Sequence, residues 1–228
     1  MGLSEALLRR PRRREIALVL GVPTTLFLAS SISWQLRRPG TGGVLFTDGR
    51  ILATLLIEAA IAAVMLFYLS RRGWKPMEVA GTPEPHDVLR GLGLWFGVIT
   101  SYAVVFIGLH FLLPDFVRPL EKPQFTGSIS APVILAAALI NPLFEEFLWL
   151  GYAIPALGNR FGLRTAVVVS VLLRVLVHVY QGRMALIAIL PLGAVLTWYY
   201  VRTKRLWPVV VAHIVVDALA LSSLMSTT

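Results

Sequence analysis

The sequence predicts an all-α protein, a polytopic membrane helical bundle with about seven transmembrane helices. Three observations support this fold class: 57% of the 228 residues are hydrophobic, only 14% are charged, and the apolar residues come in long blocks. A soluble domain of this size would carry about a quarter charged residues. Long apolar blocks are typical of helices that cross a bilayer, which takes roughly 20 residues. The lipid bilayer is therefore an expected partner.

Seven apolar segments have close to the length of a spanning helix. They cover residues 15–34, 51–70, 89–113, 131–156, 164–181, 184–201 and 206–226. The longest polar stretches, 71–88 and 114–130, are too short to be domains and are expected to be loops. We expect two parts, with three N-terminal transmembrane helices in 1–129 and a core of four helices in 130–228.

The basic residues predict the orientation of the chain. The formal net charge is +9, and the Lys and Arg residues cluster in short segments between apolar blocks. Such clusters are topology signals, so we expect no nucleic-acid partner. With the N-terminus inside, the inside segments carry fourteen of the 21 basic residues and the outside segments six, with Arg174 left within a helix. We therefore expect a cytoplasmic N-terminus and, from the compact, Arg-rich chain, a bacterial inner (cell) membrane.

Ionisable side chains inside membrane helices indicate a functional site, because each costs about 2.5–3.5 kcal/mol to insert. The first three segments contain few: Glu58, expected to make a polar interior contact, and His110, expected at the interface. The last four segments contain six, in three helices: Glu145 and Glu146, Arg174 and His178, and His213 and Asp217. Taken singly, each could be a polar contact between helices, but the set is better explained by a site.

The spacing of these residues constrains their geometry. Residues four apart share a helix face, which applies to Arg174 with His178 and to His213 with Asp217. The adjacent Glu145 and Glu146 point about 100° apart, so only one of them can aim squarely at the partner helices.

Depth in the membrane can be estimated from a rise of about 1.5 Å per residue. Glu145, His178 and Asp217 then fall near one level at the middle of the membrane, and His213 lies toward the inner side. A shared site at the midplane, opening toward the cytoplasm, is geometrically possible.

Several protease chemistries do not fit the sequence. The chain has no cysteine, no lysine within a helix, no HExxH, no G-x-S-x-G and only one aspartate well inside a helix. These absences argue against thiol, Ser–Lys, zincin, nucleophile-elbow and aspartyl-dyad sites. A glutamate and two histidines remain. A carboxylate beside a histidine can activate water, and a second histidine can donate to an oxyanion.

At these residues the chain resembles the CPBP family. This family includes type II CAAX prenyl endopeptidases and the related bacteriocin-processing or immunity proteins, also called the Abi family. Its pattern is EExxxR on one helix, FxxxH on the next, and HxxxN or HxxxD on a later one. The resemblance covers roughly residues 130–222, and the matching residues are Glu145, Glu146, His178, His213 and Asp217.

The resemblance implies an intramembrane endopeptidase that cleaves a membrane-embedded or lipidated peptide, of CAAX type or leader type. It implies that Glu145 and His178 activate the water and that Glu146 supports the site. His213 and Asp217 would lie where the family stabilises the oxyanion. We expect no metal cofactor; if zinc were bound, Glu145, His178 and His213 would be its ligands.

Two positions depart from the pattern: Leu150 replaces the arginine of EExxxR, and Arg174 replaces the phenylalanine of FxxxH. We expect Arg174 to pair with Glu146 and so restore the missing positive charge, although it could instead reach a backbone carbonyl or a water-filled cavity. The Leu150 departure keeps an alternative open, a non-catalytic immunity or partner-binding protein. A small transporter or proton relay is a third possibility, but no paired halves with matching broken helices occur.

Overall fold

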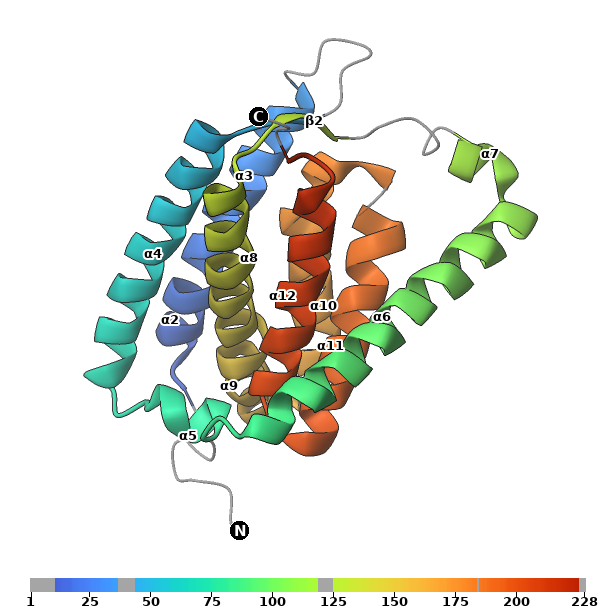
Figure 1. Ribbon diagram of the computed structural model, residues 1–228. Coiled ribbons are helices and arrows are strands. Elements are labelled where there is room, and N and C mark those ends of the chain that lie inside the picture. Colours follow the sequence, from blue (N-terminus) through green and yellow to red (C-terminus); the bar gives the residue numbers. More distant parts are fainter. Residues whose placement is uncertain (1–10, 37–43, 119–124, 184, 226–228) are drawn as a thin grey trace.

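The computed structural model describes residues 11–36, 44–118, 125–183 and 185–225, and these form a bundle of helices (Figure 1). Every predicted apolar segment is helical. The first is α2 (Arg13–Ile16), η1 (Ala17–Gly21) and α3 (Val22–Leu36), which follow one another without a break, and the next two are α4 (Asp48–Ser70) and α6 (Pro85–Leu112).

The last four predicted segments are also helical. The fourth is continuous over α8 (Ala131–Glu146), η3 (Phe147–Tyr152) and α9 (Ala153–Phe161), and α10 (Leu163–Val177) is the fifth. The sixth contains η5 (Ala185–Ile189) and α11 (Leu190–Thr203), and the seventh is α12 (Trp207–Ser222). The prediction of an all-α bundle is confirmed.

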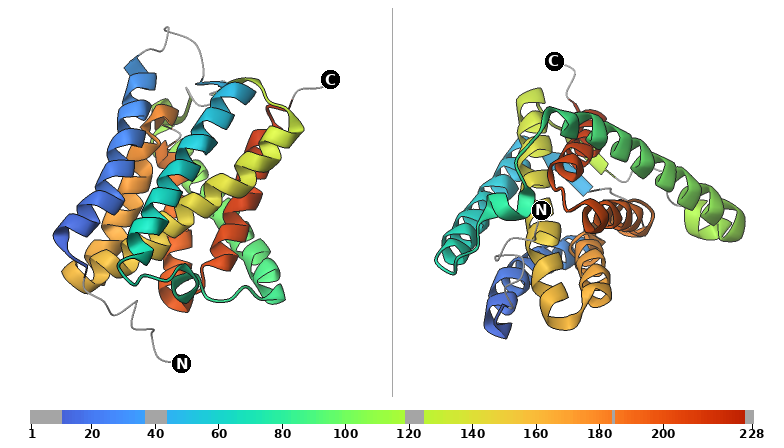
Figure 2. Two further views of the ribbon diagram at one scale, coloured as in Figure 1. Left: turned by 90° about the vertical axis from the view of Figure 1, so that its left-hand side faces the viewer. Right: turned by 90° about the horizontal axis from the view of Figure 1, so that it is seen from below.

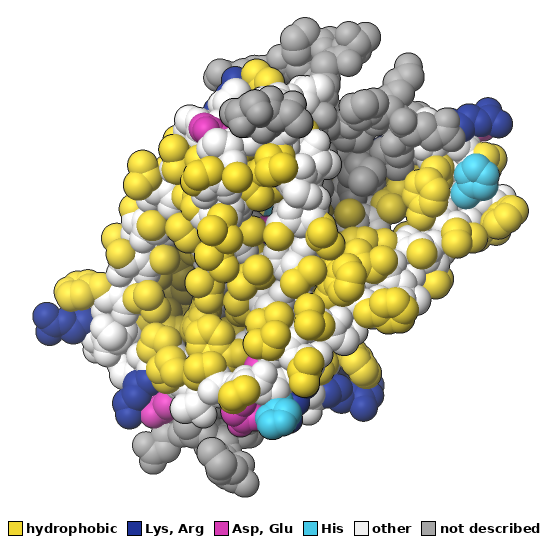
Figure 3. All heavy atoms as spheres, in the orientation of Figure 1, with side chains coloured by type: hydrophobic (Ala, Val, Ile, Leu, Met, Phe, Trp, Pro, Cys, Tyr) yellow, Lys and Arg dark blue, Asp and Glu magenta, His cyan; other side chains and the backbone are white. Residues whose placement is uncertain are grey.

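Four helices of the described chain are long and apolar enough to cross a membrane, namely Arg13–Leu36, Asp48–Ser70, Pro85–Leu112 and Ala131–Phe161. Two shorter apolar helices, Ile187–Thr203 and Trp207–Ser222, lie beside them. Hydrophobic side chains cover most of the face shown in Figure 3, while basic and acidic ones lie at its edges. The protein is an integral membrane protein.

The fifth helix is shorter than predicted. α10 ends at Val177, so His178 is the residue after the helix, with φ −100° and ψ 11°, and a 3₁₀ turn, η4 (Val179–Gln181), follows. Gly182 then takes a positive φ of 62°, a conformation that a β-carbon would strain. The predicted end at residue 181 is therefore wrong, and His178 lies at the end of a helix rather than within it.

Helix α12 contacts both predicted parts of the chain. It packs against α6 on one side and against α8 on the other, and α4 also packs against α8 (Figures 1 and 2). α6 crosses the bundle obliquely, and its second half leads away from the other helices (Figure 2, right). Phe111 and Leu112, near its end, are highly exposed, which suits a surface in contact with lipid.

The loops contain elements that the sequence did not predict. Two short helices, α5 (Pro76–Ala80) and α7 (Pro114–Val117), lie in the stretches expected to be loops. The strands β1 (Val44–Thr47) and β2 (Phe125–Ser128) pair in parallel. A β-carbon on Gly127 would come within 1.9 Å of the Phe46 carbonyl oxygen, so only glycine permits this pairing.

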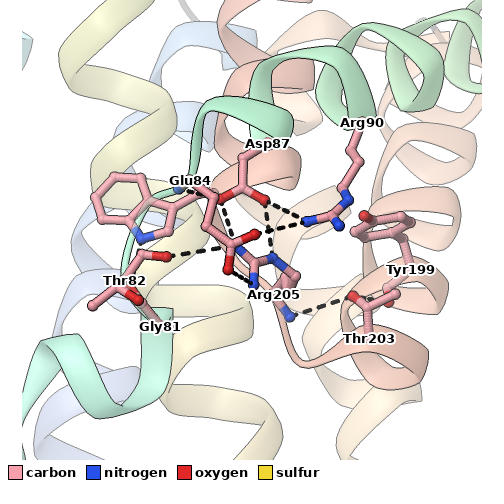
Figure 4. Close-up of polar contacts among 9 residues, drawn as sticks. Gly81, Thr82, Glu84, Asp87, Arg90, Tyr199, Thr203 and Arg205 are labelled. Carbon is pink, nitrogen blue, oxygen red and sulfur yellow. Dashed lines mark hydrogen bonds and ion pairs between the residues drawn. The ribbon is translucent and has the colours of Figure 1, made fainter.

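An ion network holds the opposite end of the bundle together (Figure 4). Arg205, in the turn between α11 and α12, donates from Nε and Nη2 to Asp87 at 2.9 and 2.7 Å and from Nη1 to Glu84 at 2.8 Å. Arg90 reaches the same two carboxylates at 3.3 Å. The hydrogen bonds to Asp87, and then those to Glu84, raise the pKa of Arg205 above its usual range. The network joins the start of α6 to the α11–α12 turn.

We predict that Arg205→Leu destabilises the protein. It removes two hydrogen bonds from the buried Asp87 and leaves the longer contact with Arg90 and the bond from the Glu84 backbone N–H, so the loss should be about 1–3 kcal/mol. Arg118→Leu is the matched control, because Arg118 pairs only with the exposed Asp115, which is worth little. The two melting temperatures in detergent are compared. An equal shift in both variants would show that the network does not anchor α6.

Candidate active site

The two glutamates lie at the end of α8, directly before a π-helical turn. α8 starts with Pro132 in its first turn, where no N–H is lost, and contains Pro142 in its interior. In the π-helical turn, η3, the backbone hydrogen bonds are spaced differently, and Ser170 of α10 donates to the Trp149 carbonyl at 2.7 Å. Such turns often occur at functional sites.

Glu146 is fully buried and joins three helices. Arg174 donates to it from Nη1 at 2.8 Å and from Nη2 at 2.7 Å, a bidentate ion pair between α10 and α8. Nδ1 of His213, on α12, lies 2.7 Å from the same carboxylate. Glu146 is 0% exposed and Arg174 is 1% exposed, so neither charge reaches water. The expected pairing of Arg174 with Glu146 is present in the structure.

Glu145 points to a different group, His178. The Nε2 atom of His178 lies 3.5 Å from Oε1 of Glu145, and its Nδ1 atom lies 2.7 Å from the Arg174 carbonyl. A carbonyl oxygen can only accept, so Nδ1 carries a proton and the neutral ring has its lone pair on Nε2. One water molecule can lie within hydrogen-bond distance of both Nε2 and the carboxylate.

His213 and Asp217 form a second polar pair on α12. Nε2 of His213 lies 3.4 Å from Asp217, while its Nδ1 is held by Glu146. Asn141, one turn before Glu145, donates to the other Asp217 oxygen at 3.1 Å. The aspartate is thus held between α8 and α12.

A cavity of about 430 Å³ connects these groups. Five of the six predicted site residues line it, namely Glu145, Arg174, His178, His213 and Asp217, and Glu146 lies behind Arg174 and His213. The structure thus brings the whole predicted set together, although their roles stay predictions.

Two further cavity residues were not proposed for the site. Asn141 is an amide in an apolar segment one turn from Glu145, and this spacing could have indicated it. Tyr102, on α6, had no such signal. Glu58, expected to make an interior contact, is buried at 4% exposure and lines the cavity, and its Oε2 atom has no hydrogen-bond partner within the described chain.

Comparison with known families supports the resemblance stated above. Residues 127–219 match the family described as type II CAAX prenyl endopeptidase Rce1-like. This segment is similar to the Rce1-like family and makes up less than half of the chain. Comparisons with curated proteins and with solved structures found no match. The resemblance to the CPBP family is confirmed, and the matched segment contains α8, α10 and most of α12, with all six site residues.

Both departures of the Rce1-like segment from the family pattern, Leu150 and Arg174, concern the surroundings of Glu146. Leu150 is fully buried in the main hydrophobic core and lies in the π-helical turn that follows Glu146. Arg174 approaches Glu146 from the neighbouring helix instead. Gly193 leaves room for it, because a β-carbon there would lie 3.3 Å from Cδ of Arg174.

A metal site does not fit the Rce1-like segment well. Among the residues that the structure describes, no three His, Asp or Glu side chains are grouped so that they could hold a metal ion. His213 turns Nδ1 to Glu146 and Nε2 toward Asp217, so both of its ring nitrogens already face carboxylates other than Glu145. The alternative zinc ligands of the sequence analysis therefore do not converge.

We predict that Arg174→Leu prevents stable folding, because it leaves the buried charge of Glu146 with His213 as its only remaining partner in the described chain, and breaking a buried ion pair costs about 3–5 kcal/mol. The double variant Arg174→Leu with Glu146→Gln should regain much of this stability, since an amide at 146 can still bond to His213. Melting temperatures in detergent distinguish the variants. If the double variant were no more stable than Arg174→Leu, the loss would come from packing and not from charge.

Proposed function

We propose that the protein is an intramembrane endopeptidase that cleaves a membrane-tethered peptide with water activated by Glu145 and His178. The observation that carries the proposal is that the adjacent glutamates have different partners. Arg174 and His213 hold Glu146, while Glu145 faces the cavity and His178. The Rce1-like family is a family of proteases, so hydrolysis of a peptide bond is the reaction class.

The first step is attack by water. A water donating to Glu145 and to Nε2 of His178 keeps an oxygen lone pair free for the scissile carbonyl carbon. As the new C–O bond forms, the water proton passes to Glu145 and the carbonyl π electrons move to the oxygen. The tetrahedral intermediate then collapses, the C–N bond breaks, and the proton on Glu145 passes to the leaving amine.

The second requirement is a donor for the oxyanion. His213 is fixed at Nδ1 by Glu146, so its Nε2 points to one place, beside Asp217. With a proton on Nε2, the ring can donate to an oxyanion formed there. Asn141 holds Asp217 and also lines the cavity. We propose that this reaction uses no bound metal, with zinc as the alternative.

A second candidate function is a non-catalytic membrane protein, such as an immunity or partner-binding factor. The observation that favours it is Leu150, which replaces the arginine of the family's first motif. The same fold and cavity would then bind a peptide without cleaving it. A cleavage assay separates the two candidates.

We predict that Glu145→Gln abolishes cleavage and keeps the fold. An amide cannot accept the water proton, whereas Glu145 makes no ion pair with Arg174 that the fold would lose. Purified protein in detergent is given a set of membrane-tethered reporter peptides, with and without a chelator. Glu78→Gln, which changes a partly exposed glutamate on α5, is the control. Absence of cleavage by the wild type would support the non-catalytic candidate, and normal turnover by Glu145→Gln would refute the role of the base.

We predict that His178→Ala and His213→Ala each lower the chemical step by roughly 10²–10⁴-fold. They should differ in stability, because His213 bonds to the buried Glu146 while His178 bonds only to a carbonyl of its own helix. Single-turnover rates give the chemical step, and melting temperatures give the stability. Variants that bound peptide poorly but cleaved it at the normal rate would contradict both roles.

A further inference from the structure

The cavity occupies only one half of the bundle. On α4 its lining runs from Arg50 to Glu58 and includes nothing from the second half of that helix. On α12 it starts at His213 and continues to the end of the helix. α3 shows the same pattern, with Phe27 at the deep end and Trp34 near the end of the helix. All of these outer positions lie at the end of the bundle that carries β1 and β2, at the top of Figure 1.

The mouth of the cavity lies at this end. Its lining includes Leu45 and Phe46 of β1, and Leu45 is well exposed. Arg50 lies with its guanidinium carbon 4.5 Å from the Trp34 ring centre. Tryptophan and arginine are residues that anchor a protein at the membrane interface. The proposed catalytic groups lie at the deep end, so β1 borders the path from this end of the bundle to them.

The other half of the bundle is closed by packing. Directly beyond the Glu146–Arg174 pair lie Leu148, Leu196 and Val209, each at 1% exposure or less. The ion network around Arg205 ties the helices together further along. Among the residues that the structure describes, Trp149, one turn beyond Glu145, is the lining residue that reaches furthest along the α8–α9 helix toward this half.

The basic residues identify the closed half with the cytoplasmic side. The residues between the helices at that end include Arg71, Arg72, Lys75, Lys204 and Arg205. At the mouth end the described basic residues between or beginning helices are Arg50, Arg118 and Arg183. An excess of Lys and Arg in short loops marks the cytoplasmic side.

We propose that the cavity opens to the extracytoplasmic side and that its substrates are membrane-tethered peptides whose cleavable segment lies on that outer face. This proposal replaces the expectation of a site open to the cytoplasm, because the expected cytoplasmic N-terminus would place the mouth outside. A lipidated tail displayed in the cytoplasm would meet the closed end. The substrate class rests on the proposed endopeptidase function, whereas the side of the opening does not.

The absence of cysteine from the sequence allows a direct test. Two single-cysteine variants report on the cavity, Thr54→Cys and Ala137→Cys, both at lining positions near the mouth. Ser70→Cys, at the end of α4, reports on the closed end, and Ser223→Cys, after α12, reports on the mouth end. A membrane-impermeant cationic methanethiosulfonate is added to right-side-out or inside-out vesicles of a bacterial host, and the labelled fraction is measured.

We expect the two cavity variants and Ser223→Cys to be labelled in right-side-out vesicles, and Ser70→Cys only in inside-out vesicles. If the cavity variants were labelled from the same side of the membrane as Ser70→Cys, the proposed position of the mouth would be wrong. Labelling of Ser70→Cys from outside would overturn the orientation, and cavity variants that react from neither side would overturn an open cavity. Labelling does not depend on cleavage, so a protein that labels as expected but cleaves nothing would contradict only the proposed function.

Discussion

The bidentate ion pair between Glu146 and Arg174 is the constraint on which the site depends. Both groups are buried in a membrane-spanning bundle, where a charge without a partner costs several kcal/mol. Their pairing fixes α10 against α8, and the bond from His213 adds α12 to the same point. The positions of Glu145, His178 and Asp217 follow from these three helices. The buried carboxylate of Glu146 therefore sets the geometry of the groups that we propose for the reaction.

The twin glutamates show how one sequence motif can provide two environments. Adjacent helical residues point about 100° apart, so Glu146 can face the interior contacts while Glu145 faces the cavity. The same guanidinium that neutralises Glu146 belongs to the residue whose carbonyl orients His178. Arg174 thus acts on both glutamates, on one through its side chain and on the other through its backbone and His178. This double role explains why an arginine on α10 is compatible with a leucine at position 150.

Much of this arrangement could be predicted from the sequence. The apolar blocks gave the helices, and the cost of six buried ionisable groups indicated that they would meet. The end of α10 at Val177 could not be predicted, because Val179 and Tyr180 continue the apolar pattern beyond His178, where the backbone leaves the α-helix. The π-helical turn after Glu146 and the parallel pairing at Gly127 also depend on tertiary contacts rather than on local patterns. The direction in which the cavity opens depends on which half of each helix packs against the other helices. The periodicity of apolar residues along the sequence does not reveal this.

Hydrolysis within a membrane needs water on one side of the reacting groups and a dry, rigid support on the other. Here the two needs are met by opposite halves of the same helices. The half near the Arg205 network is densely packed, with Leu148, Leu196 and Val209 closing the space behind Glu146. The other half is hollow and is bounded by β1 and the 3₁₀ turn after His178. Arg174 lines the cavity at the boundary between the two halves and Glu146 lies behind it, so their mutual neutralisation lets the cavity end against a hydrophobic core.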